Sequence, residues 1–169
     1  LNRHIRALSE RLVQGEPLTH NMLSWAKQHV EWSLAEGDYT AHDGVLMLVI
    51  DINGNAAMTV GEYEPLADTS AKALRARSAE ARSEADETGV APELLAAVND
   101  GELAFVAPAD ECLCGTATLI EQLAQTKGIP VTRVDIPAQL KGALFLVSDE
   151  HGVVPAADAD ADAAESDAA

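Results

Sequence analysis

The chain is poor in positive charge: its 169 residues include 11 Lys and Arg against 28 Asp and Glu, for a formal net charge of −17. A protein that binds nucleic acid or an anionic membrane surface draws much of its affinity from clustered Lys and Arg. An acidic excess repels both, so we expect neither a nucleic acid nor a membrane among the partners. Long apolar runs are also missing, since no stretch approaches the ~20 apolar residues of a membrane helix. No basic-then-apolar leader precedes the first expected helix, and we expect a cytoplasmic protein.

Cysteine and aromatic residues are scarce as well. The two cysteines, Cys112 and Cys114, are separated by one residue, and no second Cys or His pair lies near them to complete a zinc site. We interpret them as small apolar residues in a buried turn. Aromatic residues make up 4% of the chain, so the core must be built from Ala, Val, Leu and Ile. With 47% hydrophobic and 23% charged residues, the composition is that of a folded domain.

Metal ligands are present, but not at spacings that hold an ion. Asp51, Asn53 and Asn55 lack the calcium-loop pattern, because Gly54 follows Asn53 too early. The histidines are scattered, and we interpret each as a surface or capping residue: His4, His20, His29, His42 and His151. No nucleophile elbow of the G-x-S-x-G type occurs. The sequence therefore predicts no metal site and no serine hydrolase triad.

The hydrophobic pattern predicts an α/β (α+β) fold with two small lobes of mixed sheets and flanking helices. Residues 1–67 form the expected small N-terminal lobe and residues 68–155 the larger, cofactor-type lobe. Apolar residues at helical spacing or strong helix formers predict helices at about 1–13, 19–36, 69–87 and 116–126. Buried runs that meet Asn, Asp and Gly predict hairpins at 44–60, 94–106 and 142–154, and residues 129–134 predict one more strand.

The C-terminal residues 156–169 are a low-complexity run of Ala and Asp with five acidic residues. Such a run offers no apolar surface to bury, and its like charges favour extension. We predict a disordered acidic tail whose role is solubility. The chain begins with Leu1 rather than Met, and we expect that upstream residues complete any site shared with them.

One region carries a recognisable succession of motifs. A glycine turn, Gly115-Thr-Ala-Thr118, opens an expected helix, and a strand, the run Phe145-Leu-Val-Ser148 and the run Gly152-Val-Val-Pro155 follow. Free backbone N–H groups and the positive dipole end of a helix suit a phosphate. The succession resembles the C-terminal half of the fold-type IV pyridoxal-phosphate-dependent aminotransferases, the family of branched-chain aminotransferase and aminodeoxychorismate lyase.

The resemblance implies an enzyme that uses pyridoxal 5'-phosphate on a small-molecule amino-acid substrate and works as a homodimer. Lys72 would hold the cofactor as an aldimine and act as the proton shuttle. The implied cofactor-binding residues are the phosphate ligands Gly115, Thr116, Thr118 and Ser148, with Arg6 nearby.

The sequence also departs from the family pattern. The arginine of the family's H-x-x-R-L helix falls on Ala7, next to Arg6, and the arginine after the glycine turn is absent. The glutamate that faces the cofactor ring has no clean match, although Glu87 and Glu93 lie near its place. Two interpretations therefore stay open: an aminotransferase or lyase, and a non-catalytic homologue that acts as an acidic interaction or assembly module.

Overall fold

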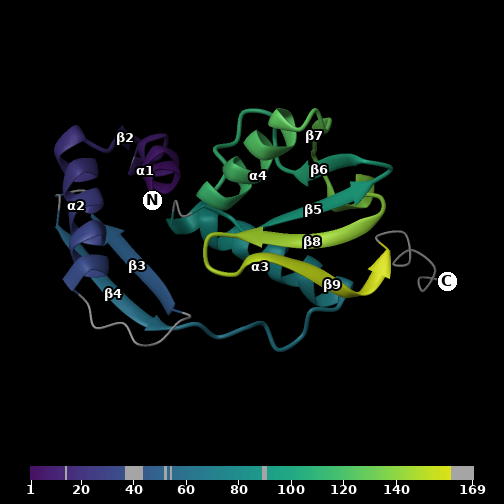
Figure 1. Cartoon of the computed structure of the whole chain (residues 1–169), viewed down its shortest axis with the longest axis horizontal. Coiled ribbons are helices and arrows are strands. Elements are labelled where there is room, and N and C mark those ends of the chain that lie inside the picture. Colours follow the sequence, from purple (N-terminus) through teal and green to yellow (C-terminus); the bar gives the residue numbers. More distant parts are fainter. Residues whose placement is uncertain (14, 37–43, 52, 54, 89–90, 161–169) are drawn as a thin grey trace. The chain divides into compact units, whose positions relative to one another are not determined.

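The chain is an α/β protein of two compact units, Leu1–Pro65 and Leu66–Ala169 (Figure 1). A computed structural model describes residues 1–13, 15–36, 44–51, 53, 55–88 and 91–160. Mixed helices and sheets confirm the fold class expected from the sequence. The division between the units falls inside the segment 62–68, which carries Pro65 and lacks any periodicity.

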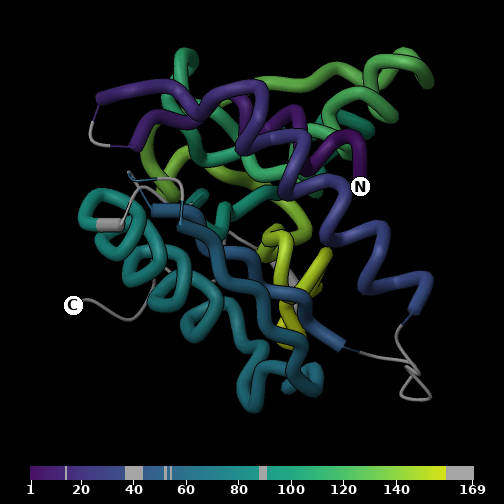
Figure 2. Tube along the Cα trace, turned by 90° about the vertical axis from the view of Figure 1, so that its left-hand side faces the viewer, coloured from purple at the N-terminus to yellow at the C-terminus, as the bar shows by residue number. Residues whose placement is uncertain are grey.

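Unit 1 pairs helices with two small antiparallel ribbons. Its elements are α1 (Asn2–Ser9), β1 (Leu12–Val13), β2 (Glu16–Pro17), α2 (His20–Glu36), β3 (Gly44–Ile50) and β4 (Ala56–Glu62). The strands β3 and β4 run side by side as a two-stranded ribbon, with Leu48 opposite Met58 (Figure 2). The Ser33 hydroxyl of α2 lies 3.7 Å from Met58 Sδ, so one face of the ribbon meets this helix.

Unit 2 is built on a five-stranded sheet in the order β7-β6-β5-β8-β9. Its strands are β5 (Leu94–Asn99), β6 (Glu102–Val106), β7 (Val131–Val134), β8 (Ala143–Ser148) and β9 (Gly152–Asp160). The helices are α3 (Ala71–Thr88), α4 (Gly115–Thr126) and the 3-10 helix η1 (Pro137–Gln139). Among the strands described, β6 and β7 pair in parallel, with α4 connecting them as a crossover, and the other pairs are antiparallel.

The two faces of this sheet are covered by different helices (Figure 1). Successive strand residues point to opposite faces, so Leu94 and Leu95 enter separate clusters. Leu94 joins the cluster that contains Ala117 of α4, whereas Leu95 joins the cluster that contains Leu74 of α3. The helices α3 and α4 therefore lie on opposite faces of the sheet, and this arrangement decides which side chains can meet.

The acidic C-terminal run departs from its predicted disorder. The strand β9 continues to Asp160, so the expectation of a disordered tail from residue 156 is wrong for residues 156–160. The Ala157 N–H donates to the Thr69 carbonyl at 2.9 Å, and the Asp158 carboxylate accepts from the Ala71 N–H at 2.6 Å. Strand pairing uses backbone groups, so a run of Ala and Asp can form a strand without apolar side chains. The Asp158 carboxylate is also stabilised because it lies at the positive, N-terminal end of α3. Residues 161–169 lie outside the described part of the chain.

Candidate functional site

The β8–β9 turn, residues 148–152, carries several polar and ionisable side chains that contact other elements of unit 2. Its Asp149 carboxylate lies at the N-terminus of α4, where it accepts three hydrogen bonds. The Gly115 N–H lies 3.1 Å from Oδ2, and the Thr116 N–H and hydroxyl lie 2.7 and 2.8 Å from Oδ1. The glycine turn thus forms an anion cradle of the kind expected, and a carboxylate of the same chain occupies it.

Other polar groups near this cradle also make hydrogen bonds within the protein. The buried Ser148 side chain accepts a hydrogen bond from the His151 N–H at 2.9 Å, which closes the β8–β9 turn. The Thr118 N–H donates to the Cys114 carbonyl at 3.0 Å, as in an ordinary first helical turn. Cys114 Sγ accepts from the Ala117 N–H at 3.4 Å and serves as the N-cap of α4.

Lys72 lies far from this cradle. It is exposed on the first turn of α3, and the neighbouring Ala71 is bonded to Asp158 of β9. Asp158 lies near the Ala143 end of β8, whereas the cradle lies beyond the Ser148 end. Four to five residues of strand separate the α3 N-terminus from the cradle, which corresponds to roughly 13–17 Å at ~3.3 Å per residue. Because α3 and α4 also cover opposite faces, the structure does not bring Lys72 and the Gly115 turn together.

Arg6 belongs to unit 1 and therefore to a different body from the cradle. It lies on α1, where its Nε is 3.9 Å from Glu10 Oε1 in an exposed pair one helical turn apart. Among the five implied cofactor ligands, the structure gathers Gly115, Thr116 and Ser148 at the β8–β9 turn, with Thr118 in the same first turn of α4.

These contacts do not fit pyridoxal phosphate. The cofactor needs a phosphate cradle with open donors and a lysine within reach of its aldehyde carbon. Here the cradle donors hold Asp149, and Lys72 lies on the other face of the sheet. A phosphate at this turn would have to displace a carboxylate that carries the same sign of charge.

A second, buried cluster lies on the other side of the same turn. Glu93 stands immediately before β5 with 9% of its side chain exposed. Arg77 of α3 donates hydrogen bonds to both carboxylate oxygens of Glu93, with Nε 2.8 Å from Oε2 and Nη2 3.1 Å from Oε1. The hydrogen bond with Glu93 raises the pKa of Arg77 above its usual value, which keeps the guanidinium charged. The Ser78 hydroxyl donates to the Glu93 carbonyl at 2.8 Å, so α3 fixes both the backbone and the side chain of this glutamate.

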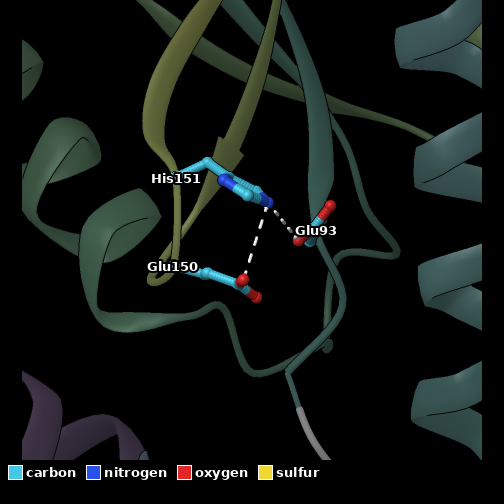
Figure 3. A group of neighbouring side chains, drawn as sticks. All are labelled: Glu93, Glu150 and His151. Atoms are coloured by element: carbon cyan, nitrogen blue, oxygen red, sulfur yellow. Dashed lines mark ion pairs between the residues drawn. The ribbon is translucent and has the colours of Figure 1, made fainter. Parts of the chain in front are cut away.

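His151 points from the turn toward this glutamate (Figure 3). Its Nε2 lies 3.8 Å from Glu93 Oε1 and 3.9 Å from Glu150 Oε1, and 5% of its side chain is exposed. The interpretation of His151 as a surface or capping residue is therefore wrong. The bond from its backbone to Ser148 folds the turn back, and the side chain is buried beside the start of β5.

Sequence reasoning missed this cluster because its members come from three separate elements. The string Ser148-Asp-Glu-His-Gly152 carried a signal, since consecutive residues with polar chemistry follow a buried strand. Nothing local indicated that Glu93, more than fifty positions earlier, would meet it.

Comparisons with known proteins assign no family to this chain: no protein-family model matches it, and no curated protein matches it. Among the described residues, none of the helices has the length and apolar character needed to cross a membrane. A hollow of about 190 Å³ on unit 1 is lined by Asn21, Met22, Trp25, Ile50 and Ala56. It is smaller than the ~300 Å³ at which ligand pockets usually begin, and it offers no charged group.

Proposed function

We propose that the chain is a non-catalytic acidic module that binds a basic partner protein. The observation that carries this proposal is the occupied cradle: Asp149 holds the Gly115 and Thr116 donors that a cofactor phosphate would need. The exposed position of Lys72 on the opposite face of the sheet supports the same conclusion. What remains is a folded scaffold with a strongly acidic surface.

The charge of unit 2 supports a basic partner. Residues 66–169 contain 7 Lys and Arg against 19 Asp and Glu, a formal charge of −12. Three of those arginines are paired with glutamates of the same unit: Arg77 with Glu93, Arg82 with Glu111, and Arg133 with Glu121. Each pair neutralises one charge of either sign, so the excess of −12 remains and produces a negative field around the unit. Such a field steers association with a positively charged surface and disfavours an acidic one.

A pyridoxal phosphate titration tests the non-catalytic half of this proposal. We expect no absorption band at ~410 nm that depends on Lys72, because an internal aldimine requires a lysine beside the bound phosphate. Lys72→Ala is compared with Lys127→Ala, which removes a second exposed lysine just after α4. A band that disappears in Lys72→Ala and persists in Lys127→Ala would overturn the proposal.

Peptide binding tests the other half. The purified protein is applied to an array of Lys- and Arg-rich peptides that have the same net charge but different residue order. The buffer contains ~150 mM salt, at which interactions between distant exposed charges are largely screened. The module proposal expects binding that depends on peptide sequence. Absence of binding, or binding that follows net charge alone, would argue against a dedicated partner.

A pyridoxal-phosphate-dependent aminotransferase or lyase is the second candidate function. The observation that favours it is that the three donors of Gly115 and Thr116 do converge on one negative group, so the turn accepts an anion. The same titration separates the two candidates. A Lys72-dependent band would direct attention to small amino acids as substrates.

We also propose a cytoplasmic location and a homodimer. Cys112 and Cys114 are not joined in a disulfide, as is usual in compartments that keep thiols reduced. Fractionation of cells would test the location, and light scattering of the purified chain would test the dimer.

A further inference from the structure

We infer that Glu93, Glu150 and His151 form a binding site for a divalent transition-metal ion, with Zn²⁺ as the best-matched probe. Among the described residues, these three bring one imidazole nitrogen and two carboxylate oxygens within 4.8 Å of one another. Figure 3 shows the imidazole pointing between the two carboxylates. This inference is independent of the proposed partner binding.

The spacing of the ligand atoms suits a small ion. His151 Nε2 lies 3.8 Å from Glu93 Oε1 and 3.9 Å from Glu150 Oε1, and both distances exceed the usual length of a hydrogen bond. With the third side of the triangle at most 4.8 Å, an equidistant ion in the plane of the three atoms would lie no more than about 2.5 Å from each atom. Zinc binds imidazole nitrogen and carboxylate oxygen at roughly 2.0–2.2 Å. In a tetrahedral site, ligand atoms at that range lie about 3.3–3.6 Å apart, so the two measured sides would shorten by roughly 0.2–0.6 Å and the third side by no more than about 1.5 Å.

The chemistry of the three ligands points to a transition metal. One nitrogen and two oxygens match Zn²⁺, which takes three protein ligands and one water in open sites. Ca²⁺ and Mg²⁺ prefer a set made only of oxygens, with six or more ligands. Half of the Glu150 side chain is exposed, whereas Glu93 and His151 are buried, so solvent can reach the ion from the Glu150 side.

Arg77 would act as the outer partner of the site. It bonds both oxygens of Glu93, and hydrogen bonds of this kind orient the carboxylates that ligate metals. Its positive charge opposes a cation, but the negative charges of Glu93, Glu150 and Glu84 all act on the same guanidinium. With a neutral His151, the two ligating glutamates and Arg77 carry a net charge of −1, which still attracts a divalent ion.

Calorimetric titration of the whole chain with Zn²⁺, after treatment with a chelator, tests the inference. We expect one equivalent of Zn²⁺ to bind. The affinity for Zn²⁺ should fall at least ~10-fold in His151→Gln and in Glu150→Gln, because loss of even a residue that only orients a metal ligand lowers metal affinity by about 10-fold or more. Matched controls change an exposed residue of the same type elsewhere: His20→Gln and Glu80→Gln. Both controls should bind as the wild type does.

A second readout guards against a variant that fails to fold. Co²⁺ bound in place of Zn²⁺ should give visible absorption in the wild type that Mg²⁺ does not displace and that Glu150→Gln abolishes. Glu150 is half exposed, so its substitution leaves the core intact even where His151→Gln disturbs it. Two results would overturn the inference. One is the absence of a stoichiometric site. The other is binding that both variants retain, because that binding would belong to the general acidic surface.

Discussion

Replacement of Asp149 by Ala tests the central contact of unit 2. The variant removes the three hydrogen bonds at the N-terminus of α4 and the negative charge at the positive end of that helix. Losing a capping side chain costs about 0.5–2 kcal/mol. Asp149 is exposed and water can solvate the freed donors, while the Cys114 cap of Ala117 remains. We therefore expect the free energy of unfolding to fall by about 1–2 kcal/mol.

Urea unfolding followed by far-UV circular dichroism measures this loss. With a slope of ~1–3 kcal/mol per molar urea, the midpoint should fall by roughly 0.3–2 M at unchanged slope. Asp110→Ala, which removes one exposed acid outside the cradle, is the matched control and should leave the midpoint in place. A loss no larger than that of the control would refute the assignment of Asp149 as the occupant of the cradle.

Added phosphate gives the experiment a second, independent outcome. In Asp149→Ala the donors of Gly115 and Thr116 are released, and inorganic phosphate can take the place of the carboxylate. At ten times its dissociation constant, phosphate would restore about 1.4 kcal/mol to the variant. The wild type should respond less, because its cradle is filled. Equal stabilisation of both proteins would show that phosphate binds elsewhere.

Three further predictions concern the rest of the fold. Gly142→Ala should lower the free energy of unfolding, measured in urea, by more than about 2 kcal/mol, because the new Cβ would overlap the backbone of β5 at a residue whose φ is 85°. Gly101→Ala is the control: its φ is 84°, but the space around it is open, so the loss should be only about 1 kcal/mol. Leu74→Ala, at a fully buried position on α3, should cost about 2–5 kcal/mol by the same measurement; a loss below 1 kcal/mol would contradict the packing of α3 on the sheet. The side-chain hydrogen bond from Asn55 lowers the pKa of Asp51 in the folded protein. This bond therefore stabilises the fold at pH values above the pKa of an unfolded Asp, about 4, and the stabilisation is lost as the pH falls through the lower pKa of the folded state. Asn55→Ala should raise the Asp51 midpoint in a carboxyl NMR titration, and an unchanged midpoint would contradict the contact.

Much of the local structure could be predicted from the sequence because it depends on neighbours in the chain. The Asn99-Asp-Gly101 turn predicted a hairpin, and Asp100 and Gly101 both adopt positive φ between β5 and β6. The pair Lys127-Gly128 predicted the end of a helix, and Gly128 follows α4 with φ 70°. The glycine turn at Gly115 predicted an anion cradle from the same kind of local reasoning.

The occupant of that cradle could not be predicted in the same way. Asp149 lies 34 positions after Gly115, and only the pairing of β8 with β5 and β9 brings its turn to the N-terminus of α4. The disorder predicted for residues 156–160 was wrong for a related reason. The composition of a segment indicates how much apolar surface its side chains can bury. It does not indicate whether the backbone pairs with another strand, and β9 is held by backbone hydrogen bonds to β8.

The sequence by itself determined where most of the helices and hairpins lie, which turns need glycine, and how acidic the chain is. Those properties arise from backbone sterics, short-range hydrogen bonds and composition. The tertiary structure alone decided that α3 and α4 cover opposite faces of one sheet, which separates Lys72 from the Gly115 turn. It also decided that Glu93 and His151 are buried side by side. Both outcomes depend on the order in which strands pair, and no local pattern in the chain encodes that order.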